Sequence, residues 1–253
     1  MTGTGPGGPL PTAAALLAAL DATWPPAARH RCGPFVLREG RGGGKRVSAA
    51  TLEAADFAPA DIDAAEAAMA ALGQAPLFML RPDSHPADAA LDAALAARGH
   101  RLVDPVVGYG APVAAWAGSV PPPVSAFWIW PPLRVMEEVW DAAGIGPARR
   151  AVMDRVPGPH TSILARSADR VAGAAFVALD GPVAMLHALE VLPHYRRQGS
   201  AVNMLRVAGR WAQDNGATVV SAMVAAANGP ARALYASLGM QNVGNYHYRA
   251  PRP

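Results

Sequence analysis

The chain alternates between stretches in which apolar residues recur at helical spacing and short apolar runs bounded by glycine, proline or aspartate. In the first half, the helical spacing predicts helices over residues 12–22, 60–73 and 87–99. Gly73 and Gly99 stand where the second and third of these helices should end. The apolar runs predict strands over residues 35–40, 45–53, 76–81 and 101–112. The glycine-rich turn "RGGG" joins the first two strands.

The second half shows the same two kinds of pattern in a longer series. Helical spacing predicts helices over residues 133–144, 147–156, 200–216 and 229–239. Apolar runs predict strands over residues 160–167, 171–179, 183–192, 218–224 and 240–250. Because helices and strands are mixed and several strands follow one another across short turns, we expect an α+β fold. Each half should hold a mostly antiparallel sheet flanked by helices.

The two halves also echo each other. The stretch "ALDAALAARGHRLVDPVVGYGAP" (90–112) parallels "PARALYASLGMQNVGNYHYRAP" (230–251), and both run helix, glycine, strand, then aromatic-x-Ala-Pro. The echo predicts an internal duplication, although chance similarity in an alanine-rich chain is the alternative. A proline cluster separates the halves. We therefore expect a flexible N-terminus over residues 1–11, domains over 12–112 and 125–253, and a linker over 113–124.

Composition limits the classes of function. Of the residues, 51% are hydrophobic and 16% are charged, which is typical of a globular protein. The net charge of +3, without a long basic run, argues against a nucleic-acid partner but suits an anionic small molecule. A single cysteine, Cys32, allows no internal disulfide and fits a reducing compartment. The N-terminus has no basic n-region and only a short alanine–leucine helix, so we do not interpret it as a signal peptide. A membrane span is not expected either, because the apolar region 171–192 contains charged and turn residues. A cytoplasmic protein without a metal site is expected.

One short segment carries the clearest chemical signal. In "LHALEVLPHYRRQGSA" (186–201), an apolar strand runs into "RRQGSA", and a predicted helix follows. A glycine turn lets successive backbone N–H groups converge, and the start of a helix adds partial positive charge. Arg196 and Arg197 add two full charges. The segment could hold a pyrophosphate, or it could be an ordinary turn with solvated arginines.

The surroundings of this loop resemble the GNAT superfamily of acyl-CoA-dependent N-acyltransferases. The family signature R/Q-x-x-G-x-G/A is matched by Arg196, Gly199 and Ala201, and "NGPARALYASLGM" begins 27 residues after Ala201. The order of strand, loop, helix, strand and short Asn…Tyr…Gly helix also matches. The resemblance covers about 125–253. The first half resembles a degenerate copy, because its strand 45–53 runs into "AADFAPADI" without an arginine or glycine loop. A tandem GNAT-like fold is therefore implied, in which only the second half binds CoA through such a loop.

The resemblance also implies roles in binding acetyl-CoA. In GNAT proteins the strand before the loop splays from its neighbour, so that free backbone groups hold the pantetheine arm. Here those groups belong to Leu189 and Val191, and the N–H of Leu189 is the candidate oxyanion donor. Asn228 is expected to contact the pantetheine, to cap its helix, or both, and Arg232 either reaches a phosphate or is a solvated charge. The predicted pyrophosphate loop consists of Arg196, Arg197, Gln198, Gly199, Ser200 and Ala201.

Three side chains are candidates for catalysis. His187 suits amine deprotonation because imidazole titrates near neutral pH, and the resemblance implies a proton relay there, but it could also be a core histidine. Strand alternation places His187, Leu189 and Val191 on one face and Glu190 on the other, unless a bulge intervenes. Glu190 is therefore either structural or catalytic. By resemblance Tyr235 is the general acid for the thiolate, and a core aromatic is the alternative.

The acceptor side is less well defined. By resemblance, the turn "GIGP" (144–147) should lie over the acceptor site, and Phe127, Trp128 and Trp130 either line an apolar pocket or pack in a strand. A second glycine loop, "EGRGGGKRVS" (39–48), superficially resembles a phosphate loop. However, Glu39 stands at its first glycine position and Arg46 at its Ser/Thr position, so we interpret it as a hairpin turn.

The leading hypothesis is an N-acetyltransferase that uses acetyl-CoA as co-substrate and acts on a primary amine of a small molecule or peptide. The alternative is a non-catalytic acyl-CoA-binding regulatory module. No metal, nucleic acid or membrane is expected to take part, and the protein should be a monomer or homodimer.

Overall fold

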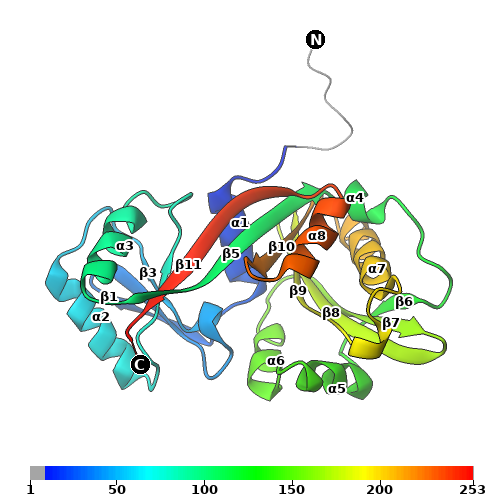
Figure 1. Ribbon diagram of the computed structural model, residues 1–253, viewed down its shortest axis with the longest axis horizontal. Helices are drawn as coiled ribbons and strands as arrows, with labels where there is room; N and C mark the ends of the chain where they lie inside the picture. Colours follow the sequence, from blue (N-terminus) through cyan, green and yellow to red (C-terminus); the bar gives the residue numbers. More distant parts are fainter. Residues whose placement is uncertain (1–8, 253) are drawn as a thin grey trace, which may run out of the picture.

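The computed structural model describes residues 9–252, through which a single mixed sheet of 11 strands runs (Figure 1). The strands are β1 (Ala28–Cys32), β2 (Phe35–Glu39), β3 (Ala50–Leu52), β4 (Phe78–Leu80), β5 (Arg101–Pro112), β6 (Ala126–Ile129), β7 (His160–Ser167), β8 (Arg170–Asp180), β9 (Val183–Val191), β10 (Val219–Ala225) and β11 (Gln241–Ala250). The helices are α1 (Ala13–Thr23), α2 (Pro59–Ala71), α3 (Asp88–Ala97), α4 (Ala114–Ala117), α5 (Arg134–Ala142), α6 (Pro147–Met153), α7 (Ser200–Asp214) and α8 (Gly229–Ser237), with 3₁₀ turns η1 (Lys45–Val47) and η2 (Pro193–Tyr195). Most of the predicted flexible N-terminus, residues 1–8, lies outside the described range.

The α+β fold class predicted from the pattern is confirmed, and most elements lie within a few residues of their predicted positions. Two differences affect the site. The predicted strand over 45–53 is wrong in its first part, because residues 45–47 turn as η1 and only Ala50–Leu52 pair with β2. The strand β1 was missed because its sequence, ARHRC, is mostly polar and lies at the edge of the sheet. The "RGGG" turn does connect two antiparallel strands, as predicted.

The two halves exchange strands at the centre of the sheet. Its order is β1-β2-β3-β4-β11-β5-β10-β9-β8-β7-β6, so the last strand of the chain, β11, lies between two strands of the first half. Conversely, β5 of the first half lies between β11 and β10 of the second. The two strands are long and pair antiparallel with each other (Figure 1). The units α3–β5 and α8–β11, which echo each other in sequence, therefore occupy equivalent places about the centre, and neither half completes a sheet alone.

Only two of the neighbouring strand pairs in this sheet are parallel. They are β3–β4 in the first half and β9–β10 in the second, and each pair is connected by a crossing helix, α2 or α7. The other pairs are antiparallel. Because parallel strands need a long crossover connection, the two halves share one topological plan around their parallel pairs.

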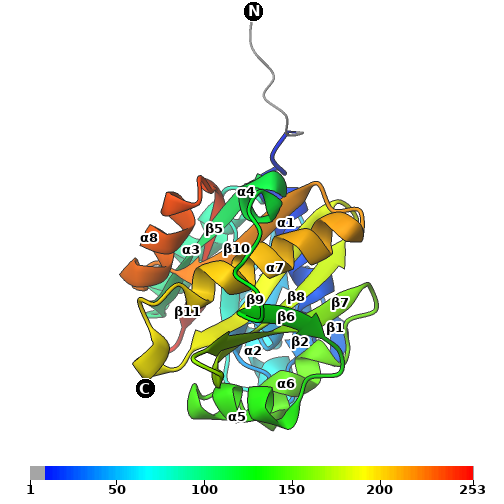
Figure 2. The same ribbon diagram turned by 90° about the vertical axis from the view of Figure 1, so that its right-hand side faces the viewer.

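Helices cover both faces of the sheet. In the second half, α7 lies across one face while α5 and α6 lie on the other (Figure 2). Ala-rich β8 is buried along nearly its whole length, which explains its continuous apolar sequence. The proline-rich segment 113–124 begins with α4, whose Trp116 is buried in the α7 core. The boundaries at 112 and 125 stay a prediction. Within residues 9–252, no helix has the length and apolarity to cross a membrane.

Candidate active site

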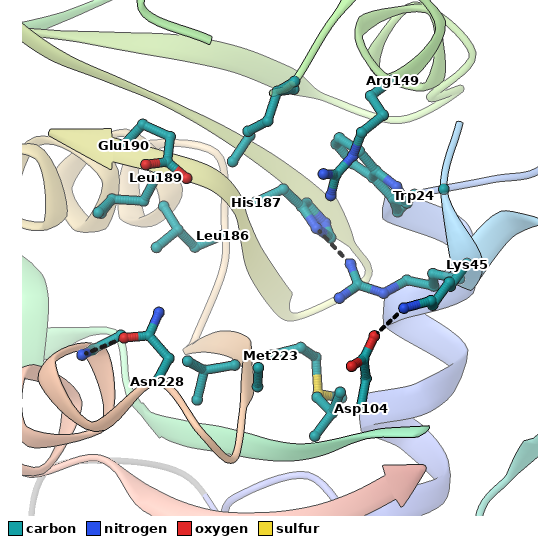
Figure 3. Close-up of a pocket in the computed structure, with 18 of the residues that line it drawn as sticks. Trp24, Lys45, Asp104, Arg149, Leu186, His187, Leu189, Glu190, Met223 and Asn228 are labelled. Atoms are coloured by element: carbon teal, nitrogen blue, oxygen red, sulfur yellow. Dashed lines mark hydrogen bonds and ion pairs between the residues drawn. The ribbon is translucent and has the colours of Figure 1, made fainter. Parts of the chain in front are cut away.

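A wedge opens between β9 and β10. Their parallel pairing ends at Leu186 and Ala222, and beyond this point the two strands diverge. A cavity of about 530 Å³ begins there, a size typical of small-molecule sites. In Figure 3, Leu186, His187, Leu189 and Glu190 of β9 line one side of it, while Met223 of β10 and Asn228 lie opposite.

A β-bulge decides which side chains of β9 face one another. His187 pairs with Phe176, and Glu190 pairs with Ala174, so two residues of β9 lie opposite one residue of β8. Ala188 carries the irregularity with a φ of +48°. Simple alternation along β9 therefore stops at His187, because the bulge that was the stated exception is present. The extra residue reverses the faces, so Glu190 lies on the same face as His187.

The bulge also turns backbone groups of β9 away from β8. The Ala188 carbonyl accepts a hydrogen bond from Trp140 Nε1 at 2.8 Å. The N–H of Leu192 donates to the Ala172 carbonyl at 2.9 Å, and antiparallel geometry then directs the groups of Val191 to the open side. The Val191 carbonyl accepts from Arg196 Nε at 3.0 Å. Leu189 lines the cavity, and its predicted role toward a thioester stays a prediction.

The predicted pyrophosphate loop lies at the end of this strand. Arg197 and Gly199 have φ values of +62° and +85°, so the backbone turns sharply before Ser200 begins α7. The first N–H groups of α7 have no acceptor within the helix and face the loop with the positive end of the helix dipole. Gln198 donates to the His194 carbonyl at 2.8 Å, which steadies the turn. The side chains of Arg196 and Arg197 are exposed, and Ala201 follows in the first turn.

Glu190 is a half-buried carboxyl that lines the cavity. Burial raises its pKa above the ordinary value, and the charges of Arg196 and Arg149 offset only part of that rise. A carboxyl with a raised pKa is a stronger base than a solvated one once it is ionised.

His187 is buried, with 6% of its surface exposed, and both ring nitrogens have neighbours. Nε2 lies 2.9 Å from Thr23 Oγ1, and the Thr23 hydroxyl donates to the Ala19 carbonyl at 2.7 Å. Because the Thr23 hydroxyl already donates its hydrogen, it must accept a hydrogen bond from Nε2–H of His187. Nδ1 of the neutral ring then carries the lone pair and lies 3.5 Å from Arg46 Nη1. The ring stacks on Trp24. Burial, followed by the Arg46 charge, lowers the pKa of His187 well below its ordinary value.

Tyr235 and Asn228 both come from the α8 region and line the cavity. Tyr235 packs against Tyr109, and burial, reinforced by the Glu190 charge, raises the pKa of its hydroxyl. It therefore stays protonated at all physiological pH values. Asn228 caps α8, since its Oδ1 accepts from Ala231 N at 3.1 Å. Arg232 lies outside the cavity lining and donates to the Ala226 carbonyl at 3.1 Å.

The predicted acceptor loop lies beside the cavity, as the position of Ile145 among the lining residues indicates. Arg149, in the first turn of α6, also faces the cavity (Figure 3). The three aromatic residues upstream do not line it. Phe127 and Trp128 are on the edge strand β6 with exposed side chains, and Trp130 packs edge-on against His160.

The first half contributes several cavity residues that the sequence interpretation missed. Trp24 follows α1, Lys45 and Arg46 come from η1, and Asp104 comes from an irregular point in β5 where φ is +43°. Lys45 forms an ion pair with Asp104. Lys45 and Arg46 are visible in the sequence as basic residues after "RGGG". Only the packing of the two halves shows that they line the cavity of the second half.

In the first half, the side chain of Arg81 links the ends of the parallel strands β3 and β4. After β3 and β4, Arg81 donates through Nη2 to the Leu52 carbonyl and through Nη1 to Glu53 at 3.1 Å. Its backbone N–H donates to the buried carboxylate of Asp88 at 2.6 Å. Arg81 and Glu53 also line a smaller cavity of about 270 Å³. Elsewhere in residues 9–252, no group of His, Cys, Asp and Glu is arranged to hold a metal ion.

Part of the chain matches the model of a known family. Residues 126–240 match the model of the acetyltransferase (GNAT) family. No curated protein matches the chain significantly. A GCN5-related N-acetyltransferase from Kribbella flavida has a similar structure, with a TM-score of 0.69 and 19% identity over 95% of this chain and 94% of that one. A conserved protein of unknown function from Staphylococcus epidermidis gives 0.66 and 12% identity over 88% and 93%.

A tandem GNAT protein from the clavulanic acid biosynthesis pathway is also similar, with a TM-score of 0.55 and 13% identity over 89% of this chain and 84% of that one. At such low identity these likenesses show the fold. They confirm the predicted tandem arrangement, in which the first half is a GNAT-like copy.

Proposed function

Because the second half of the chain belongs to the acetyltransferase (GNAT) family, we propose that the protein transfers an acetyl group from acetyl-CoA to a primary amine of a small molecule or peptide. The observation that carries this proposal is the wedge where β9 and β10 diverge, with a cavity lined by Glu190 beside it and the predicted pyrophosphate loop after the end of β9. Family membership alone indicates acyl-CoA-dependent acetyl transfer only in general.

The donor would bind along β9. The N–H groups at the start of α7, together with Arg196 and Arg197, would hold the pyrophosphate, because they combine full charges with a helix dipole. The backbone of Leu189 and Val191 would hold the pantetheine arm, and the N–H of Leu189 would donate to the oxyanion. Asn228 has a free amide NH₂ after capping α8 and would contact the same arm.

The reaction would follow direct attack. The nitrogen lone pair of the amine forms a bond with the thioester carbonyl carbon, which gives a tetrahedral oxyanion. The oxyanion collapses, the carbon–sulfur bond breaks, and its electron pair leaves on sulfur. The amine loses one proton to a base, and the thiolate gains one, so an amide and free CoA result.

We assign the base to Glu190 rather than to His187. The Glu190 carboxyl lines the cavity and has a raised pKa, whereas His187 has both nitrogens engaged and a lowered pKa. His187 would instead position Arg46. Tyr235 would donate a hydrogen bond to the leaving sulfur, since its hydroxyl stays protonated.

The alternative, a non-catalytic acyl-CoA-binding module, shares the loop and the wedge but needs no base. The two readings separate in one experiment. Acetyl-CoA binding is first measured by isothermal titration calorimetry, and thiol release is then followed with a panel of amines. Binding with amine-dependent release supports the enzyme. Binding without release from any amine supports the regulatory module, and absence of binding contradicts both.

A further inference from the structure

Two arginines from different halves of the chain reach the end of the cavity away from the loop. Arg46 lies on η1 of the first half, and Arg149 lies on α6 of the second. Neither guanidinium forms a salt bridge with a carboxylate of residues 9–252. The nearby carboxylate of Asp104 is already paired with Lys45. Among the described residues, this end of the cavity therefore holds two guanidinium groups that no carboxylate contacts, although the charge of Glu190 acts on Arg149 from a distance.

The Arg46 guanidinium has hydrogen-bonding neighbours within the protein but keeps unused N–H donors. Its Nε donates to the Tyr246 hydroxyl at 3.2 Å, and Nη1 lies 3.5 Å from His187 Nδ1. Tyr248 is also close to the guanidinium. Because a guanidinium has five N–H donors, donors remain for a ligand after these contacts. The side chain is partly buried, and a desolvated cation without an anion is costly unless something binds it.

Arg149 is kept near Arg46 by the packing of the glycine turn against α6. A Cβ on Gly43 would lie 2.7 Å from Val152 Cγ2, so a larger residue would push the turn off the helix. At Gly44, an added Cβ would come within 3.6 Å of Arg149 Nε. The two like charges act on each other, since partial burial and the Arg46 charge both lower the pKa of Arg149. Both arginines still stay protonated at neutral pH.

The cavity thus carries a negative group, Glu190, and two positive groups, Arg46 and Arg149, at different places along its wall. In Figure 3, Glu190 lies on one side of the cavity and Arg149 on the other, with His187 between them and Trp24 beside Arg149. Arg46 lies within 3.5 Å of His187 and lines the same cavity. The Glu190 carboxylate attracts an ammonium group, and planar guanidinium groups suit a carboxylate. An amine that carries a carboxylate would match both ends at once.

We propose that the acceptor is a small amine bearing a carboxylate, of the amino-acid type, whose carboxylate binds Arg46 and Arg149 while its amine lies toward Glu190. This inference rests on the proposed acetyl transfer. It gives the first half a function: without a CoA loop of its own, it supplies half of the acceptor site.

The test uses a panel of amino acids that differ in side chain and amine position, each paired with its carboxamide. Thiol release and calorimetric binding in the presence of CoA are measured for every pair. We expect at least one acid to be favoured over its carboxamide. Arg149→Gln should lower the preference for that acid over its carboxamide about ten- to a hundredfold, while the KM of acetyl-CoA stays unchanged. Any effect on the Glu190 pKa acts on acid and carboxamide alike and cancels in this ratio.

Arg210→Gln removes the same charge from an exposed position outside the cavity and should leave all values unchanged. Equal loss for acid and carboxamide in Arg149→Gln would overturn the inference. So would the absence of any preference for acids across the panel in both assays. If an acid binds preferentially but no amine is acetylated, the acetyl-transfer proposal fails while the carboxylate site stands.

Discussion

Glu190 and His187 lie on the same face of β9, because Ala188 and Leu189 together oppose the single residue Ala175 of β8. Without this bulge the carboxyl would point to the opposite side of the sheet, toward the α7 core. The bulge therefore brings the two titratable side chains to one face. Burial shifts both toward their neutral forms, because it raises the pKa of Glu190 and lowers that of His187.

Glu190→Gln should lower kcat about a hundredfold to ten-thousandfold, since a positioned base contributes that much. Acetyl-CoA affinity should be retained, because the loop is untouched. In the wild type, kcat/KM should fall on the acid side at a pH above that of an ordinary carboxyl, because the Glu190 pKa is raised. His187→Gln should lower kcat far less and keep this acid limb. A lost acid limb in His187→Gln, with an intact one in Glu190→Gln, would reverse the assignment.

The Glu190 substitution should also change the pH dependence of stability. A carboxyl with a raised pKa in the folded state binds its proton more tightly there than in the unfolded chain. The protonated group therefore does not oppose folding at low pH, whereas the ionised group destabilises the folded state at high pH. Urea unfolding at pH 8 should thus show Glu190→Gln to be at least as stable as the wild type. The relative advantage should shrink as the pH falls toward 4.5. A variant whose advantage grows at low pH would argue against a raised pKa.

His187 should make the protein sensitive to mild acid. Its folded pKa is well below 6.5, so below that pH the unfolded chain takes up a proton that the folded chain does not. Stability should fall as the pH falls from 6.5 toward the folded pKa. Relative to His187→Gln, the wild type should lose stability between pH 7 and 5 in urea titrations, while the other histidines cancel in the comparison. A difference that is constant over this range would contradict the burial of a neutral imidazole.

Gly199→Glu should weaken acetyl-CoA binding about a hundredfold or more, because it places a negative charge where the pyrophosphate is expected. Gly216→Glu is a matched control at the other end of α7. The two glycines have φ values of +85° and +88°, and neither would bring a Cβ within 4 Å of another atom. Their strain should be similar, so a melting curve and a calorimetric titration of each separate strain from binding. Equal losses of affinity in both variants would exclude a specific role for the loop.

The exchange of β5 and β11 predicts that the halves do not fold apart. Chains 1–112 and 113–253, expressed separately, each lack a strand that the other supplies, so each leaves an open edge and should aggregate. The intact chain should unfold in one transition, with fluorescence and circular dichroism changing together. Two separate transitions, or a soluble and folded fragment, would contradict the shared sheet.

The sequence predicted what depends on local pattern. Helical spacing and glycine stops located α2, α3 and α7, and the spacing of Arg196, Gly199 and Asn228 located the loop and the α8 cap. The alternation rule failed at Ala188 because nothing in "LHALEV" marks an inserted residue. Arg46 was judged only as a residue of a glycine turn, because its partners His187 and Tyr246 are 141 and 200 residues away. Such contacts depend on the strand exchange, and no local pattern encodes it.

The most direct measurement follows the acetyl group itself. Isotope-labelled acetyl-CoA is incubated with the protein and the amine panel, and mass spectrometry quantifies labelled amide beside released thiol. One labelled acetyl amide for each thiol, dependent on Glu190, is the result predicted here. Tight binding of acetyl-CoA with no labelled amide from any amine would contradict the proposed acetyl transfer.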